Sequence, residues 1–359
     1  MIHIHNKTLQ DLEFSTVLQQ ISELCITALG HEQTLKIEPF KSKEAVLNSL
    51  TLTNEFLASF YNDNRIPNHG FETIAKELKL LNIENTYLEA HSLKKIVAIS
   101  LTSNEIIRFL KKFEEYYPKL YEFASNIEVT KVIIDQIDLI IDRFGDVKDT
   151  ASPLLSELRQ EINKIKGKIN QSFTTALNSY HQLDYLDDIR ESVVDNKRVL
   201  AVKAMYRRKV KGAIMGGSKT GSIVYIEPET TLQHTRELNN LEYEEHEEVI
   251  RVLKSLTNFI RPFLPLLKQY QEFLTEMDVI SAKAKYAKSL NAVLPEINTN
   301  RKLFLRDAYH PLLYLSNLKK KAKTYPQSIE LNQENRIIVI SGPNAGGKSI
   351  TLKTVGLLQ

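Results

Sequence analysis

The fold at the end of this chain is decided by one stretch, Gly342-Pro343-Asn344-Ala345-Gly346-Gly347-Lys348-Ser349. It fits the pattern of a glycine, any four residues and then Gly-Lys-Ser, which is typical of a phosphate-binding loop. Glycines let the backbone bend so that successive N–H groups point at a β-phosphate, and the following helix adds its dipole. Lys348 would then contact the β- and γ-phosphates, and the Ser349 hydroxyl would bind Mg²⁺. The loop therefore predicts a site for ATP and Mg²⁺.

The residues around this loop supply the context that such a site needs. The apolar run at 337–340 predicts a buried strand, residues 350–355 can continue as a helix, and shorter strands are predicted at 302–306 and 329–331. Hydrolysis also requires a carboxylate on a second strand and a group that positions water. Only ten residues follow Ser349, and one or two parallel strands cannot bury their faces. The chain as printed is therefore expected to be inactive as an ATPase.

The composition is that of an ordinary globular protein, with 42% hydrophobic and 25% charged residues. Glycine and proline are sparse, which favours helices. The single cysteine, Cys25, excludes an internal disulfide, fits a reducing compartment and is expected in the core. No apolar leader segment and no run of about 20 apolar residues occur. The sequence predicts a soluble cytoplasmic protein with no membrane partner.

The predicted fold is mainly α, and residues 1–150 are expected to form a helical core. Apolar residues recur there at helical spacing, first at Leu9, Leu12, Val17, Ile21 and Leu24. Residues 101–120 predict another amphipathic helix. Residues 262–295 predict a helical return to this core, broken at Pro265. Residues 296–359 are expected to form the first part of an α/β P-loop domain.

Between these parts, residues 151–261 predict a two-helix arm, called the lever below, that carries a small β-rich tip at about 190–228. One seam alternates steps of three and four, through Leu155, Leu158, Ile162, Ile165, Ile169, Ser172 and Ala176. The second runs from Thr231 to Arg261, through Leu238, Leu241, Val249, Val252, Leu256 and Phe259. Residues 197–202 and 222–226 predict strands between the seams. Paired antiparallel, the two helices would bury each other's apolar stripes.

Basic charge is concentrated in the tip. Residues 190–219 hold nine Lys or Arg against two acidic residues, an excess of seven in a chain whose net charge is +3. Such a patch attracts phosphate backbones without reading sequence. The predicted nucleic-acid contacts are Lys197, Arg198, Lys203, Arg207, Arg208, Lys209, Lys211 and Lys219. The alternative is a solvated hairpin whose lysines protect its edges, and Tyr206 could either stack on a base or pack.

Other titratable residues suggest structure rather than catalysis. The acidic run Glu242, Glu244, Glu245, Glu247 and Glu248 is predicted to be a solvated helix face, with a metal cluster as the alternative. His310 is expected to be structural, since no nucleophile or acid can be paired with it. The sequence shows no nuclease constellation.

The chain resembles the MutS family, in particular the second bacterial branch of the endonuclease type that usually ends in a Smr domain. The phosphate loop and the following Thr351-Leu352-Lys353-Thr354 match that family. Further matches cover nearly the whole chain: Leu12-Glu13-Phe14, residues 142–152, residues 221–228 with Asn239-Asn240, Asp278 with Ala282, Ala284, Tyr286 and Ala287, and His310-Pro311-Leu312-Leu313. Tyr309 departs from the family, which often has arginine there.

The resemblance implies a DNA clamp that binds branched or recombining DNA without sequence specificity and suppresses recombination or acts in DNA repair. It implies a homodimer with nucleotide sites shared between subunits, an ATPase using ATP and Mg²⁺, and an endonuclease activity to be tested in the full-length protein. Coupling would run from the P-loop through the lever to the tip.

Three alternatives stay open at this point. The same clamp could serve a quality-control ATPase that acts on stalled or collided ribosomes and contacts rRNA. An SMC-like or transporter-type ATPase also combines such a loop with a coiled coil, but it places the loop before the coil. The chain as printed could also be a binding scaffold without catalysis.

Overall fold

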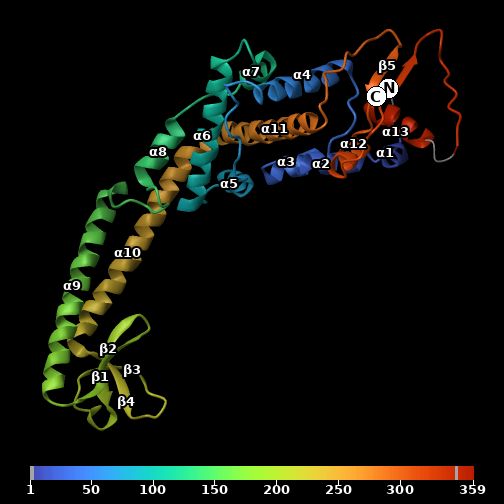
Figure 1. Ribbon diagram of the computed structural model, residues 1–359. Helices are drawn as coiled ribbons and strands as arrows, with labels where there is room; N and C mark the ends of the chain where they lie inside the picture. Colours follow the sequence, from blue (N-terminus) through green and yellow to red (C-terminus); the bar gives the residue numbers. More distant parts are fainter. Residues whose placement is uncertain (1–3, 344–346) are drawn as a thin grey trace. The chain divides into compact units, whose positions relative to one another are not determined.

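The computed structural model describes residues 4–343 and 347–359, and Figure 1 shows the course of the chain. Its contacts divide it into two compact units. Unit 1 comprises Met1–Asn82, Ser92–Ile134 and Pro262–Gln359, and unit 2 comprises Ile83–His91 and Asp135–Arg261. Among the described residues, no helix combines the length and apolar character needed to cross a membrane.

The chain is mainly helical. Its helices are α1 (Asn6–Asp11), α2 (Phe14–Ser22), α3 (Ala28–Leu35), α4 (Lys43–Ser59), α5 (Ala75–Leu81), α6 (Ala90–Lys112), α7 (Pro118–Ala124), α8 (Val132–Ile140), α9 (Pro153–Gln182), α10 (Glu229–Ile260), α11 (Leu264–Ser289), α12 (Pro311–Lys319) and α13 (Lys348–Leu358). Short 3₁₀ turns lie at Asp149–Ala151, Ala204–Tyr206 and Arg261–Phe263. The strands are β1 (Leu186–Val194), β2 (Lys197–Lys203), β3 (Gly212–Gly217), β4 (Ile223–Pro228), β5 (Leu303–Ala308) and β6 (Gln327–Leu331).

Helix α11 is the central helix of unit 1. In Figure 1 it runs between α4 and the pair α2 and α3, and it contacts all three. Tyr270, Leu274, Met277 and Ala282 are fully buried along it. Pro265 lies in its first turn, where a missing N–H costs nothing, so this proline starts the helix. The prediction that Pro265 breaks a helix was therefore wrong.

Two other helix predictions in unit 1 change at local backbone features. The first helical stretch is divided into α1 and α2 because Glu13 adopts a left-handed conformation with φ of 58°. The helix predicted over 101–120 ends at Lys112, and α7 begins at Pro118. Pro118 disfavours helical dihedrals at the preceding residue, Tyr117, which explains this second break.

In unit 2, α9 and α10 run antiparallel and side by side, with the sheet where α9 ends and α10 begins (Figure 1). Ser152 caps α9, since its hydroxyl accepts the Leu155 N–H at 3.0 Å and Pro153 occupies the first turn. The predicted seam is buried from Leu155 to Ile165. Closer to the sheet, Phe173 is buried while Ser172 is only half-buried. On α10, Phe259 is 40% exposed, so its predicted place in the seam was wrong.

The tip is a four-stranded antiparallel sheet in the order β1-β2-β4-β3. The predicted strands at 197–202 and 222–226 correspond to β2 and β4, which pair in its centre. A two-residue turn, Asp195 and Asn196 with φ of 48° and 62°, joins β1 to β2 and matches the right-handed twist of a hairpin. Leu200, Val202 and Ile226 pack against Phe173 of α9. This apolar cluster fixes the sheet on the lever.

The region before the phosphate loop differs from its prediction. The strands predicted at 302–306 and 329–331 exist as β5 and β6, paired antiparallel. Residues 337–340 do not form a strand, and Ile337 and Val339 are 84% and 86% exposed. A buried parallel strand needs neighbours on both sides and helices on both faces. Among the described residues, β5 and β6 pair only with each other, so the buried-strand prediction was wrong for this chain.

Candidate nucleic-acid interface and nucleotide site

Three of the predicted contact residues in the tip are neutralised by carboxylates. Lys197 lies 3.6 Å from the buried Glu227, Arg198 lies 2.6 Å from Glu191, and Lys203 lies 2.9 Å from Asp184. The Arg198 guanidinium also lies over the Phe173 ring at 4.3 Å. These three side chains therefore stabilise the sheet and its junction with α9.

The hydrogen bond between Lys203 and Asp184 raises the pKa of the lysine and lowers the pKa of the carboxyl. The carboxylate partners lie outside the strand that holds these bases: Asp184 precedes β1 and Glu227 belongs to β4. The charge count over residues 190–219 did not include Asp184 or Glu227. No spacing in the sequence indicates that these two carboxylates lie beside the basic side chains of β2.

The other five predicted contacts are free of carboxylates. Arg207, Arg208, Lys209, Lys211 and Lys219 are all exposed, and none forms an ion pair within the part of the chain that the structure describes. Four of them lie between β2 and β3, directly after the turn Ala204–Tyr206. The net positive field of the tip therefore comes from this short segment, which we call the basic loop (residues 207–211).

The base of the basic loop is held by stacked tyrosines. The Tyr206 ring stacks on Tyr185 with centroids 4.7 Å apart, and Tyr185 stacks on Tyr180 at 6.3 Å. The Lys209 ammonium lies 5.7 Å from the Tyr185 centroid and 5.8 Å from that of Tyr206. Tyr206 is half-buried against the apolar cluster of the sheet. Of the two readings that the sequence left open, packing is the one observed.

The acidic run on α10 connects the two lever helices. Glu245 pairs with Arg159 at 2.7 Å, and Glu242 pairs with Lys166 at 3.3 Å, both across the helix interface. The Glu248 carboxylate is buried, accepts the Ser152 hydroxyl at 2.5 Å and pairs with Arg251. The Arg251 hydrogen bond outweighs burial and lowers the pKa of Glu248. The prediction of a wholly solvated face was wrong for Glu245 and Glu248, whereas Glu242 is exposed as predicted.

The phosphate loop is described on both sides of a gap, and the predicted contacts Asn344, Ala345 and Gly346 lie outside the described residues. Gly347, the N-cap that precedes α13, has φ of 84°, a conformation that glycine adopts without steric cost. The Lys348 ammonium reaches back to the Gly342 carbonyl at 2.7 Å. Ser349 is exposed in the first turn of α13. The helix after the loop thus forms as predicted.

The parts that could hold ATP and Mg²⁺ are therefore the first turn of α13, Lys348 and the Ser349 hydroxyl. Across residues 4–343 and 347–359, no group of three or more His, Cys, Asp or Glu side chains could hold a metal ion. A magnesium ion would depend on Ser349 and on the nucleotide's own phosphates. The donor set fits a nucleotide-borne ion and supplies no independent metal centre.

Helix α13 is anchored to the helical part of unit 1. Lys353 donates to the Glu13 carboxylate at 2.8 Å, and this hydrogen bond lowers the pKa of Glu13. Leu357 packs against the cluster of Val17, Ile21 and Tyr286. A Cβ on Gly356 would lie 2.7 Å from the end of the Leu12 side chain, so a larger residue there would require this side chain to shift. Helix α13 is thus docked on α1, α2 and α11.

His310 has a structural position beside this contact. It is buried, and its Nδ1 accepts the Leu313 N–H at 3.5 Å at the start of α12. Burial lowers the pKa of His310. This arrangement agrees with the expectation of a structural histidine.

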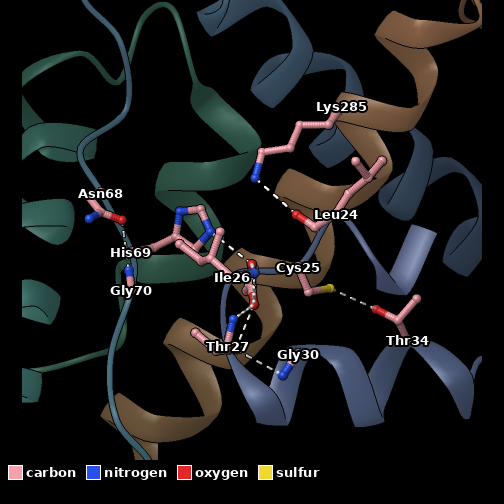
Figure 2. Close-up of polar contacts among 11 residues, drawn as sticks. Leu24, Cys25, Ile26, Thr27, Gly30, Thr34, Asn68, His69, Gly70 and Lys285 are labelled. Atoms are coloured by element: carbon pink, nitrogen blue, oxygen red, sulfur yellow. Dashed lines mark hydrogen bonds and ion pairs between the residues drawn. The ribbon is translucent and has the colours of Figure 1, made fainter. Parts of the chain in front are cut away.

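Figure 2 shows a buried polar network of unit 1 around the Asp278 carboxylate of α11. This carboxylate accepts hydrogen bonds from the N–H groups of Ile26 and Thr27, from the Thr27 hydroxyl and from His69 Nε2, at 2.6–3.1 Å. The Thr27 hydroxyl in turn caps α3 by accepting the Gly30 N–H. Burial alone would raise the pKa of Asp278, and the hydrogen bonds outweigh it and lower the pKa.

This network is a structural centre. The carboxylate is 0% exposed, and its acceptor sites are used by backbone and side-chain donors. Cys25 lies beside it, half-buried, with its Sγ 3.3 Å from the Thr34 hydroxyl. The sequence marked Asp278 only through its family resemblance, and no spacing indicated that it would meet Ile26 and Thr27.

Comparison with known proteins gives consistent results. The endonuclease MutS2 of Ligilactobacillus salivarius is 31% identical over 362 residues, which cover 99% of this chain and 45% of that protein. The MutS2 endonucleases of Finegoldia magna (31% over 359 residues) and Alkaliphilus oremlandii (29% over 361 residues) align over 98% and 99% of the chain. The chain spans less than half of the length of these relatives, 44–45%. No family model matches it.

Proposed function

We propose that this chain, which belongs to the MutS2 type of the MutS family, is the clamp and the first part of the ATPase domain of a DNA-associated ATPase. In this proposal the sheet at the end of α9 and α10 contacts a nucleic-acid backbone. The phosphate loop binds ATP with Mg²⁺. The relatives named as endonucleases motivate the DNA partner, and the tip supplies the contact surface.

The observation that carries the proposal is the basic loop. Arg207, Arg208, Lys209 and Lys211 are exposed and lack carboxylate partners, whereas Lys197, Arg198 and Lys203 are neutralised. Exposed cations without partners repel one another, and a phosphate backbone relieves this repulsion while releasing its own counterions. We therefore propose that the basic loop and Lys219 contact the nucleic-acid backbone. The three basic side chains that form ion pairs stabilise the sheet.

Such a surface reads charge and spacing rather than sequence. The Tyr206 ring is packed against Tyr185 and is not available as a platform for bases. Contacts to phosphates position a protein on nucleic acid but carry no sequence information. The proposed clamp therefore binds without sequence specificity, and a preference for branched DNA would come from geometry.

The nucleotide part of the proposal rests on Lys348 and α13. Lys348 would contact the β- and γ-phosphates, and Ser349 would contact a nucleotide-bound Mg²⁺. Because α13 is docked through Lys353 and Glu13, a nucleotide at its first turn acts on a helix that is fixed to the body of unit 1. Catalysis, a dimer with shared sites and cleavage of DNA are proposals for the full-length protein, in which Lys348→Ala is expected to abolish ATP turnover.

The experiment is a titration of labelled four-way-junction, duplex and single-stranded DNA with this chain at about 50 and 200 mM salt. Five phosphate contacts predict that the affinity falls about 10²–10³-fold over that interval. The variant with Arg207, Arg208, Lys209 and Lys211 changed to alanine should lose about four fifths of this dependence, because Lys219 remains. Collided ribosomes are the comparison arm, since rRNA offers the same phosphates. Salt-independent binding, or no difference between the chain and the variant, would refute the clamp.

A further inference from the structure

A groove of about 460 Å³ lies where α9 and α10 meet the sheet of the tip. Residues 168–180 of α9 form one wall, and residues 228–234, at the start of α10, form the other. Lys211, the last residue of the basic loop, also lines it. Apart from Ala176 and Pro228, every lining residue has a polar side-chain atom.

The groove has an excess of positive charge. Lys168 and Lys211 line it, both are exposed, and neither forms an ion pair in the part of the chain that the structure describes. Glu229 is the one carboxylate among the lining residues. The neighbouring lysines of α9 do have partners, since Lys164 lies 3.8 Å from Glu161 and Lys166 lies 3.3 Å from Glu242. Lys168 thus differs from its neighbours in forming no ion pair within the described residues.

The groove also has donors suited to an oxyanion. Helix α10 begins there after Pro228, without a side-chain cap, so its first turn and the positive end of its dipole belong to the groove. The hydroxyl of Ser179 lines it without a hydrogen bond within the described residues. His234 lines it too, and its buried Nδ1 has no hydrogen-bond partner there. The Nδ1 lies 3.7 Å from the Glu237 carboxylate, beyond hydrogen-bonding distance.

The backbone of Lys211 is held in place against both helices. Its N–H donates to the Tyr180 hydroxyl at 3.2 Å, and its carbonyl accepts the Glu229 N–H at 3.1 Å. Lys211 is therefore fixed between α9 and α10, while Arg207, Arg208 and Lys209 continue from it as exposed cations. A charged path leads from the basic loop into the groove.

We propose that this groove binds a phosphate group, with Lys168 and Lys211 as its cationic contacts and the first turn of α10 as its source of N–H donors. This inference rests on the proposed function for the source of the phosphate, which is the nucleic-acid backbone held by the basic loop. It adds a contact on the lever itself, so that the bound strand touches α9 and α10 as well as the sheet.

Lysine-selective ¹³C-methyl NMR on the whole chain tests the proposal, because dimethylation keeps the charge and gives each lysine its own signal. Arginine substitutions assign Lys168, Lys211, Lys209 of the basic loop and the control Lys164. The chain is titrated with a short DNA duplex and, separately, with inorganic phosphate. The expected result is that duplex shifts the signals of Lys168 and Lys211 and leaves Lys164 in place. Inorganic phosphate should shift the same two signals at higher concentration.

The two proposals fail in different ways. If duplex shifts Lys209 but not Lys168, the clamp stands and the groove is overturned. If inorganic phosphate shifts Lys168 and the duplex does not, the groove takes a free anion and its assignment to the backbone is wrong. If duplex shifts no lysine signal, both proposals fail.

A matched pair of variants gives a second readout. Lys168→Gln should lower the slope of log affinity against log salt by about one, and Lys164→Gln, the same charge change one turn away on the same helix, should leave it unchanged. Equal slopes for the two variants would overturn the groove.

Discussion

The buried Asp278 carboxylate predicts a large and local loss of stability on substitution. It accepts the N–H groups of Ile26 and Thr27, the Thr27 hydroxyl and His69 Nε2. In Asp278→Asn, one acceptor oxygen is replaced by an NH₂ group, so about two of these donors lose their acceptor. A buried donor without a partner costs about 1–3 kcal/mol, which gives a loss of about 2–6 kcal/mol.

The assay is hydrogen exchange followed by mass spectrometry on peptides that cover α3, with urea unfolding as a second measurement. A loss of 2 kcal/mol corresponds to amide exchange about 30 times faster where exchange reports the opening equilibrium. The control is Glu272→Gln on the same helix, since Glu272 forms only an exposed pair with Lys268 at 3.7 Å and should change stability by less than about 1 kcal/mol. Equal exchange in the two variants would refute the role of Asp278 in holding Thr27, the cap of α3.

The same substitution has a defined pH dependence. Because the pKa of Asp278 is lowered in the folded chain, its stabilisation is fully present above the unfolded pKa of about 3.9 and is lost as the pH falls through the folded value. The difference in stability between the chain and Asp278→Asn should be constant from about pH 5 to 8 and shrink below about pH 4. A difference that grows as the pH falls would contradict the lowered pKa.

Two further predictions concern the tip. A Cβ on Gly212 would lie 2.1 Å from the Glu227 carbonyl, whereas a Cβ on Gly216, at a similar φ, would meet open space. Gly212→Ala should therefore destabilise the tip by about 1–3 kcal/mol more than Gly216→Ala in urea unfolding. Equal effects would contradict the close approach. Tyr206→Leu should change affinity for single-stranded DNA less than about twofold because the ring packs on Tyr185, and a loss of fivefold or more, the size of a lost base stack, would show that Tyr206 contacts bases.

Local patterns predicted the lever and the centre of the sheet. The seam from Leu155 to Ile165, the Ser152 cap and strands β2 and β4 are set by spacing within a few residues of the chain. The edge strands β1 and β3 were not predicted. β3 is rich in glycine, and β1 has a register shift before Glu191, which interrupts the alternation that marks a strand.

Contacts between distant parts of the sequence could not be predicted in this way. Asp278 meets Ile26 across 252 positions, and no period links them. Likewise, the charge count placed eight contact residues in the tip, but three of them meet acids whose position depends on strand pairing. Residues 337–340 show the converse, since an apolar run becomes a buried strand only where neighbouring strands and helices cover it.

The central claim is that the exposed lysines and arginines of the tip that form no ion pair hold a nucleic-acid backbone. It is tested most directly by the salt dependence of duplex binding for two triple variants that remove the same charge. One carries Arg207→Gln, Arg208→Gln and Lys209→Gln, and the other changes the three ion-paired bases Lys197, Arg198 and Lys203 to glutamine. Circular dichroism first establishes that both are folded.

The first variant should lower the slope of log affinity against log salt by up to about 2.7, because each lost phosphate contact lowers that slope by about 0.9. The second variant should lower it by less than about one. Equal reductions, a larger reduction in the second variant, or no binding by the unsubstituted chain at about 50 mM salt would contradict the account.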